Sequence, residues 1–166
     1  MQKKQSVMND RKTMALLALT ILWMGVVFYF SSQPADKSAY VSGYVTKELL
    51  RLSDRLSGGH TPQFISGFIL GTDHLVRKFG HVFEYIILGG LVISFVRRLG
   101  TRKRFMAALL ICMLYAASDE IHQMFVPGRG PLVTDAMLDS VSSAAGISLV
   151  TLWAWLRARR LKAGGQ

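Results

Sequence analysis

The sequence contains a single cysteine, Cys112, and it has no internal repeat and no low-complexity tract. One cysteine cannot form an intramolecular disulfide, and because Cys112 lies within an apolar run we expect it to serve in packing. No RNP, zinc-finger or helix-turn-helix pattern accompanies the formal net charge of +10, so nucleic acid is not expected as a partner. No serine, threonine or cysteine stands in a known nucleophile motif, which argues against acyl-transfer chemistry.

Apolar residues are abundant and make up 51% of the chain. Runs long enough to cross a bilayer predict transmembrane helices, and the first run is followed by no Ala-x-Ala site that would mark a cleaved signal peptide. We therefore predict an all-α, multi-pass membrane protein with a single domain over residues 1–166. Its four predicted spans cover about 14–30, 78–97, 105–123 and 135–156.

Basic residues indicate the orientation of these spans. Thirteen of the twenty lysines and arginines lie in three short blocks beside the spans: Lys3, Lys4, Arg11 and Lys12; Arg97, Arg98, Arg102, Lys103 and Arg104; and Arg157, Arg159, Arg160 and Lys162. Short basic segments stay on the cytoplasmic side of a membrane. We therefore predict that both termini and the connection between the second and third spans are cytoplasmic.

The connection over residues 31–77 would then be a long outer loop. It carries two amphipathic patterns, and both predict helices that lie along the membrane surface. The first pattern consists of Val41, Val45, Leu49, Leu52 and Leu56, and the second consists of Phe64, Ile65, Phe68 and Ile69. Glycines near position 58 end the first helix, and the Thr61-Pro62 pair favours the start of the second.

Polar and ionisable residues gather at the outer ends of the last three spans. Helical spacing places those of each span on one stripe: Lys78, His81 and Tyr85, with Glu84 beside them; Tyr115, Asp119 and Gln123, with His122 beside them; and Asp135, Asp139, Ser142, Ser143 and Gly146. Such groups are costly in hydrocarbon and usually face the protein interior. We expect His81, Asp119, Arg129 and Asp135 to converge in one polar cavity that opens to the outer surface.

The residues alone leave three interpretations of this cluster open. In the first, the groups satisfy one another in a network that fixes the register of the helices, as buried polar groups usually do. In the second, they bind a ligand without chemistry. In the third interpretation they form the active site of an intramembrane enzyme, with His81, Asp119 and Glu120 as the candidate catalytic residues.

A metal site is a further possibility that we do not favour from the sequence. Carboxylate and imidazole groups stand one helical turn apart in two pairs, His81 with Glu84 and Asp119 with His122. The order of the first pair is reversed from the usual Glu-x-x-His pattern, and two nearby cations, of Lys78 and Arg129, would repel a metal ion. We predict neither a metal nor a cofactor.

The polar residues also form four motifs in a fixed order: Lys78-x-x-His81-x-x-x-Tyr85, Asp119-Glu120-x-x-Gln123, Pro127-Gly128-Arg129, and Asp135 with Asp139 four residues later. This set resembles the VanZ-like family of small membrane proteins, and the resemblance covers about residues 14–155. It implies a helical protein of the bacterial cell membrane that is associated with resistance to glycopeptide antibiotics, teicoplanin especially.

The resemblance further implies which residues bind a ligand. The family's polar positions correspond to Lys78, His81, Tyr85, Asp119, Glu120, Gln123, Arg129 and Asp135. Asp139 stands where asparagine is common and adds a charge to the predicted ligand-binding set, while Ser142 stands where glycine is common and is expected to loosen packing. The expected partners are membrane lipids and either a lipid-linked envelope precursor or a glycopeptide. The alternative is an enzyme that acts on an envelope lipid or precursor.

Overall fold

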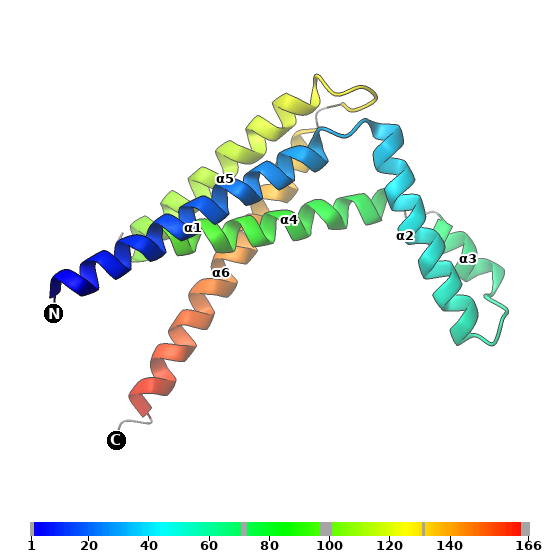
Figure 1. The fold of residues 1–166 in the computed structure, drawn as a ribbon. Helices are drawn as coiled ribbons and strands as arrows, with labels where there is room; N and C mark the ends of the chain where they lie inside the picture. Colours follow the sequence, from blue (N-terminus) through cyan, green and yellow to red (C-terminus); the bar gives the residue numbers. More distant parts are fainter. Residues whose placement is uncertain (1, 71–72, 97–100, 131, 164–166) are drawn as a thin grey trace.

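The computed structural model describes residues 2–70, 73–96, 101–130 and 132–163, and in these ranges the chain forms helices joined by loops, without strands. Figure 1 shows the six helices found there. They are α1 (Gln2–Ser31), α2 (Ala35–Leu56), α3 (Gln63–Leu70), α4 (Asp73–Phe95), α5 (Thr101–Gln123) and α6 (Val133–Ala163). The all-α prediction is confirmed.

Four of the helices are long and apolar enough to cross a membrane. The spans lie at Asp10–Ser31, Leu75–Phe95, Thr101–Gln123 and Val133–Lys162. They correspond in number and order to the four predicted spans, so the prediction of four helices able to span a membrane is confirmed. The second span, which lies in α4, ends at Phe95, before the predicted limit at residue 97. Arg97 and Arg98 lie outside the described residues. The lengths and compositions of these four helices therefore support the prediction of a multi-pass membrane protein.

The buried core lies where α1, α4, α5 and α6 meet (Figure 1). It consists of Val27, Tyr85, Leu88, Val92, Ile93, Ala108, Cys112, Ala116 and Ile147. Cys112 is a free, fully buried thiol in this core, in agreement with the packing role expected of it. The remaining apolar side chains of the spans are largely exposed, as is normal for helices that face lipid.

The closest contact in the bundle is between α4 and α6, and two glycines make it possible. A Cβ atom placed on Gly146 would lie 2.0 Å from the carbonyl oxygen of Ile86, and one on Gly89 would lie 2.2 Å from the carbonyl oxygen of Ser143. Small residues let the backbones of membrane helices approach in this way. The contact brings the polar stripe of α4 opposite that of α6.

The predicted amphipathic helices are present as α2 and α3. Both lie away from the main bundle at one end of it, and α2 also packs against α4 (Figure 1). Helix α2 ends at Leu56. There the backbone amide of Ser57 donates to the carbonyl oxygen of Ser53, and Gly58 takes a φ of 70°. Their location on the outer side of the membrane stays a prediction.

The orientation can be tested with reporters. Because the basic blocks hold the termini inside, a reporter that is active only in the cytoplasm should be active when it is fused after Gly164. A reporter that is active only outside the membrane should be active when it is inserted after Gly59. Outer activity of the Gly164 fusion would reverse the predicted orientation.

Candidate functional site

The loop between α5 and α6 is fixed against the start of α2. The amide of Ala35 donates to the carbonyl oxygen of Pro127 at 3.2 Å. Gly128 has a φ of 74°, a conformation that favours glycine, and a Cβ there would lie 3.1 Å from the Cβ of Ala35. Arg129 follows directly and reaches back over the helix ends. The Pro127-Gly128 turn therefore determines where the guanidinium lies.

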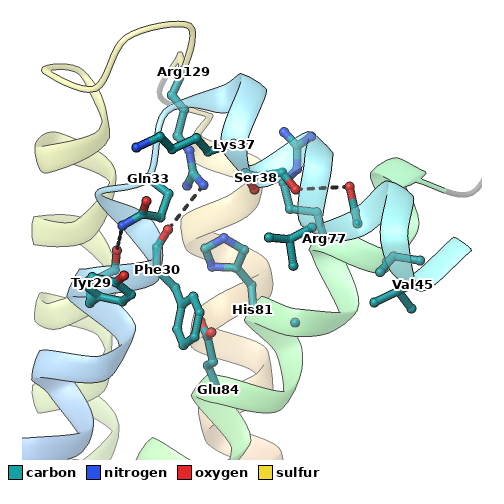
Figure 2. A pocket seen from close by; sticks show the side chains of 14 residues that line it. Tyr29, Phe30, Gln33, Lys37, Ser38, Val45, Arg77, His81, Glu84 and Arg129 are labelled. Carbon is teal, nitrogen blue, oxygen red and sulfur yellow. Dashed lines mark hydrogen bonds between the residues drawn. The ribbon is translucent and has the colours of Figure 1, made fainter.

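Beneath Arg129 is a cavity of about 380 Å³ between α1, α2 and α4. Figure 2 shows the Arg129 side chain extending toward the ring of His81, with Glu84 one turn deeper on α4. The lining residues are Tyr29, Phe30, Gln33, Lys37, Ser38, Val41, Ser42, Val45, Val76, Arg77, Gly80, His81, Glu84 and Arg129. We call this space the basic cavity, after its three cations.

Those cations come from three different segments: Lys37 from α2, Arg77 from α4, and Arg129 from the loop. The Nε atoms of Arg77 and Arg129 are buried, and neither has a hydrogen-bond partner among the described residues. Partial burial lowers the pKa of the Arg129 guanidinium, and the neighbouring charge of Arg77 lowers that pKa further. An anion in the cavity would accept hydrogen bonds from the unpartnered Nε atoms, and its negative charge would offset the repulsion between the two guanidinium groups.

The walls of the basic cavity are largely apolar. Tyr29 and Phe30 contribute aromatic surface from α1, and Val41, Val45 and Val76 contribute aliphatic surface from α2 and α4. The cavity therefore combines a cationic region with hydrocarbon-like walls. Such a combination fits an amphiphile, with an anionic head group beside the cations and a chain along the apolar surface.

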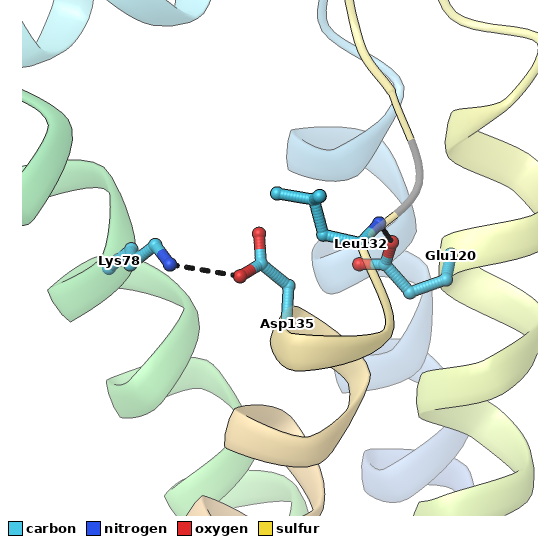
Figure 3. A network of polar contacts seen from close by, with 4 residues as sticks. All are labelled: Lys78, Glu120, Leu132 and Asp135. Atoms are coloured by element: carbon cyan, nitrogen blue, oxygen red, sulfur yellow. Dashed lines mark hydrogen bonds and ion pairs between the residues drawn. The ribbon is translucent and has the colours of Figure 1, made fainter.

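A second, much smaller cavity of about 20 Å³ lies on the other side of His81. It is lined by Lys78, His81, Glu120, Gln123, Asp135, Leu138 and Asp139. Figure 3 shows its ion pair, in which Lys78 Nζ donates to Asp135 Oδ1 at 3.0 Å. In the same view the amide of Leu132 donates to Glu120 Oε2 at 2.9 Å, so Glu120 fixes the chain just before α6.

Three polar side chains are buried at the centre of the bundle. Asp119 is 3% exposed, Asp139 is 2% exposed and Tyr85 is fully buried. One oxygen of Asp119 accepts a hydrogen bond from Gln123 Nε2 at 3.2 Å, and that amide also donates to Ser31 Oγ at 2.9 Å. Asp119 Oδ1, Asp139 Oδ1 and the Tyr85 hydroxyl have no partner within the described ranges.

The sequence prediction of one shared cavity is wrong in its detail. His81 borders both cavities, but Arg129 lines only the basic cavity and Asp135 only the small one, while Asp119 lines neither. The expected pairing of Arg129 with the acids is likewise absent among the described residues. Arg129 instead donates to the carbonyl oxygen of Phe30 at 3.4 Å, because the loop directs it toward the end of α1.

Two other predicted members of the cluster face α1. His122 lies 3.0 Å from Ser32 Oγ and packs on the ring of Phe28, with 4.3 Å between ring centroids. The Tyr115 hydroxyl donates to the carbonyl oxygen of Met24 at 2.6 Å. Both side chains therefore contact α1, although the ring of Tyr115 also lies near Tyr85 of α4, with 6.2 Å between ring centroids.

The sequence reasoning did not single out Lys37 and Arg77 as site residues. Arg77 immediately precedes Lys78, so the first polar motif gave a signal that could have found it. Lys37 gave no such signal, because its role depends on α2 packing against α4. That packing joins segments that are distant in the sequence.

Comparison with known proteins supports the resemblance noted from the motifs. The family model described as VanZ/LLP1 matches residues 16–154. No curated protein and no solved structure matches the chain significantly. The matched range includes all four spans except the N-terminal end of the first and the basic end of the last, together with the loop that carries Arg129 and the residues that line both cavities. The chain therefore belongs to the VanZ/LLP1 family.

Proposed function

We propose that this protein binds an anionic, lipid-linked molecule of the cell envelope in the basic cavity and thereby lowers the susceptibility of the cell to glycopeptide antibiotics, teicoplanin especially. The observation that carries the proposal is the convergence of Lys37, Arg77 and Arg129 on one cavity with apolar walls. The antibiotic phenotype comes from the family resemblance.

The charge of the cavity favours a phosphate-bearing head group. Arginine has a planar fork of donors that matches phosphate, and lysine adds a mobile point charge. Glu84 is the only carboxylate among the described residues that line the cavity, so the cations there outnumber the anions. A head group with one or two phosphates would balance this charge.

The walls favour a ligand with a long hydrocarbon chain. Tyr29, Phe30 and Val41 are all more than half exposed, so the apolar side of the cavity continues into the surface that faces lipid. A chain bound there would remain in the membrane while its head group entered between α1 and α2. Free sugars and soluble phosphates lack the part of the molecule that would contact these walls.

A binding measurement tests the head-group requirement. Purified protein in nanodiscs should bind a polyprenyl phosphate at least about tenfold more tightly than the corresponding neutral polyprenol, a difference of about 1.4 kcal/mol. Native mass spectrometry or fluorescence displacement would measure both affinities. Equal affinity for the two lipids would contradict the proposed recognition of an anion.

A cellular measurement tests the phenotype. Expression in a teicoplanin-susceptible bacterium should raise the inhibitory concentration several-fold over an empty vector, and Arg77→Ala should remove most of that increase because one of three cations is lost. Arg55→Ala is the matched control, since Arg55 is exposed and lies at the far end of α2. The proposal fails if the Arg77 variant protects as well as the control at equal membrane abundance.

A further inference from the structure

We infer that His81, Asp119 and Asp139 form a binding site for one divalent first-row transition-metal ion at the junction of α4, α5 and α6. Each residue offers one ligand atom, and the three atoms all lie within 4.8 Å of one another. Two metal–ligand bonds of about 2.1 Å place adjacent ligands roughly 3.0 to 3.4 Å apart, so side-chain movements of about 1 to 2 Å would close the coordination shell. We call this the three-helix site.

The burial of the two acids is the independent reason to place a cation here. Asp119 and Asp139 are 3% and 2% exposed, and each has one oxygen without a hydrogen-bond partner in the described parts of the chain. Two carboxylates in a membrane interior are costly without compensation. A divalent ion would balance both charges at once.

The other unpartnered atoms nearby belong to neutral groups suited to the same ion. His81 Nδ1 is buried and has no described partner, which leaves its lone pair available for coordination. The Tyr85 hydroxyl, one helical turn from His81 on α4, is fully buried and has no partner among the described residues. It would be free to donate a hydrogen bond to a coordinating carboxylate of the three-helix site.

The repulsion expected from neighbouring cations is reduced by their own contacts. Lys78 is paired with Asp135 at 3.0 Å, one helical turn from Asp139, and Arg129 donates to the carbonyl oxygen of Phe30 on the far side of His81. The proposed ligands also differ from the two pairs considered from sequence spacing, His81 with Glu84 and Asp119 with His122. His122 contacts Ser32 instead, and Asp139 of α6 joins His81 and Asp119.

The donor set determines the class of ion. One imidazole and two carboxylates suit Zn²⁺, Mn²⁺ or Fe²⁺ better than Cu⁺, which prefers sulfur, or Ca²⁺, which prefers more oxygen ligands. Three protein ligands leave at least one coordination position open. Because His81 also lines the basic cavity, the ion would lie directly behind the cations proposed to hold an anionic head group.

Metal content tests this inference without any lipid ligand, so its failure is distinguishable from failure of the proposed function. Tag-free protein treated with chelator, incubated with Zn²⁺ or Mn²⁺ and desalted should retain close to one ion per chain by elemental analysis. Asp119→Asn and Asp139→Asn should each weaken binding at least about tenfold, as loss of a coordinating carboxylate does. Asp36→Asn, which removes an exposed acid in the first turn of α2, should retain the ion.

A second measurement covers the case in which the aspartate variants fail to fold. Mn²⁺ bound to the wild-type protein should show nitrogen hyperfine coupling from one imidazole by pulsed electron paramagnetic resonance, and His81→Gln should abolish that coupling. The inference would be overturned if the wild-type protein retained only a small fraction of an ion per chain. Retention of the ion by folded Asp119→Asn and Asp139→Asn, or of the nitrogen coupling in His81→Gln, would overturn it as well.

Discussion

Replacement of Gly146 by alanine is expected to destroy the packing of α4 on α6. The new Cβ would lie 2.0 Å from the carbonyl oxygen of Ile86 and 2.8 Å from its carbonyl carbon, distances that no folded protein accommodates. Both clashing atoms belong to helix backbone, so no side chain can rotate away. We expect destabilisation of at least about 3 kcal/mol, at the upper end for overpacked cores. Thermal denaturation and the monodisperse fraction in detergent would measure it.

The control for this prediction is Gly25→Ala in α1. Gly25 also lies in a span, but a Cβ there would meet nothing within 4 Å, and alanine is the better helix former. Its variant should denature at or above the wild-type temperature. Gly90→Ala should be intermediate, because its Cβ would meet a side-chain methyl of Val150 at 3.3 Å. If Gly146→Ala melts like Gly25→Ala, the close α4–α6 contact is not present in the membrane.

This contact also links packing to the site. Gly146 lies two helical turns below Asp139 on α6, and Gly89 lies about two turns below His81 on α4. The glycines therefore set the distance between the helices that carry two of the three proposed metal ligands. A Gly89 variant that is still partly folded should therefore lose its bound metal ion before it loses its helix content.

The sequence predicted those features of the fold that depend on local pattern. The presence and approximate position of each span follow from runs of apolar residues, and α2 follows from the spacing of Val41, Val45 and Leu49. The approach of α6 to another helix was also predictable, because Ser142, Ser143 and Gly146 form a narrow face. In each case neighbours in the sequence determine the outcome, so tertiary contacts are not needed.

The site depended on contacts that no local pattern encodes. Whether His122 faces α4 or α1 is decided by a rotation of α5 that also turns Tyr115 toward Met24. Whether Arg129 meets a carboxylate is decided by the amide of Ala35, which holds the loop from a position 94 residues earlier. The division of the predicted pocket into two cavities follows from these long-range contacts, since His81 then stands between them.

Arg129→Ala is expected to abolish the protection against teicoplanin while the protein still inserts and accumulates. The guanidinium is half-buried over the basic cavity, and its one described hydrogen bond is a long one, of 3.4 Å, to Phe30. Because no carboxylate in the described parts of the chain is paired with it, its loss should cost little stability. Its loss should weaken binding of a polyprenyl phosphate at least about tenfold, or about 1.4 kcal/mol, since a charge-assisted contact to phosphate disappears.

Arg129→Lys separates charge from geometry. Lysine keeps the positive charge but has no planar fork, and its Nζ cannot contact two phosphate oxygens in the arrangement that a guanidinium allows. We therefore expect partial protection: more than with Arg129→Ala and less than with wild type. Inhibitory concentrations at matched membrane abundance, with the exposed Arg55→Ala as control, would rank the variants. If Arg129→Ala protects as well as wild type, Arg129 is an ordinary loop charge outside the binding site. If Arg129→Lys protects as well as wild type, only the charge of Arg129, and not its planar geometry, contributes to binding.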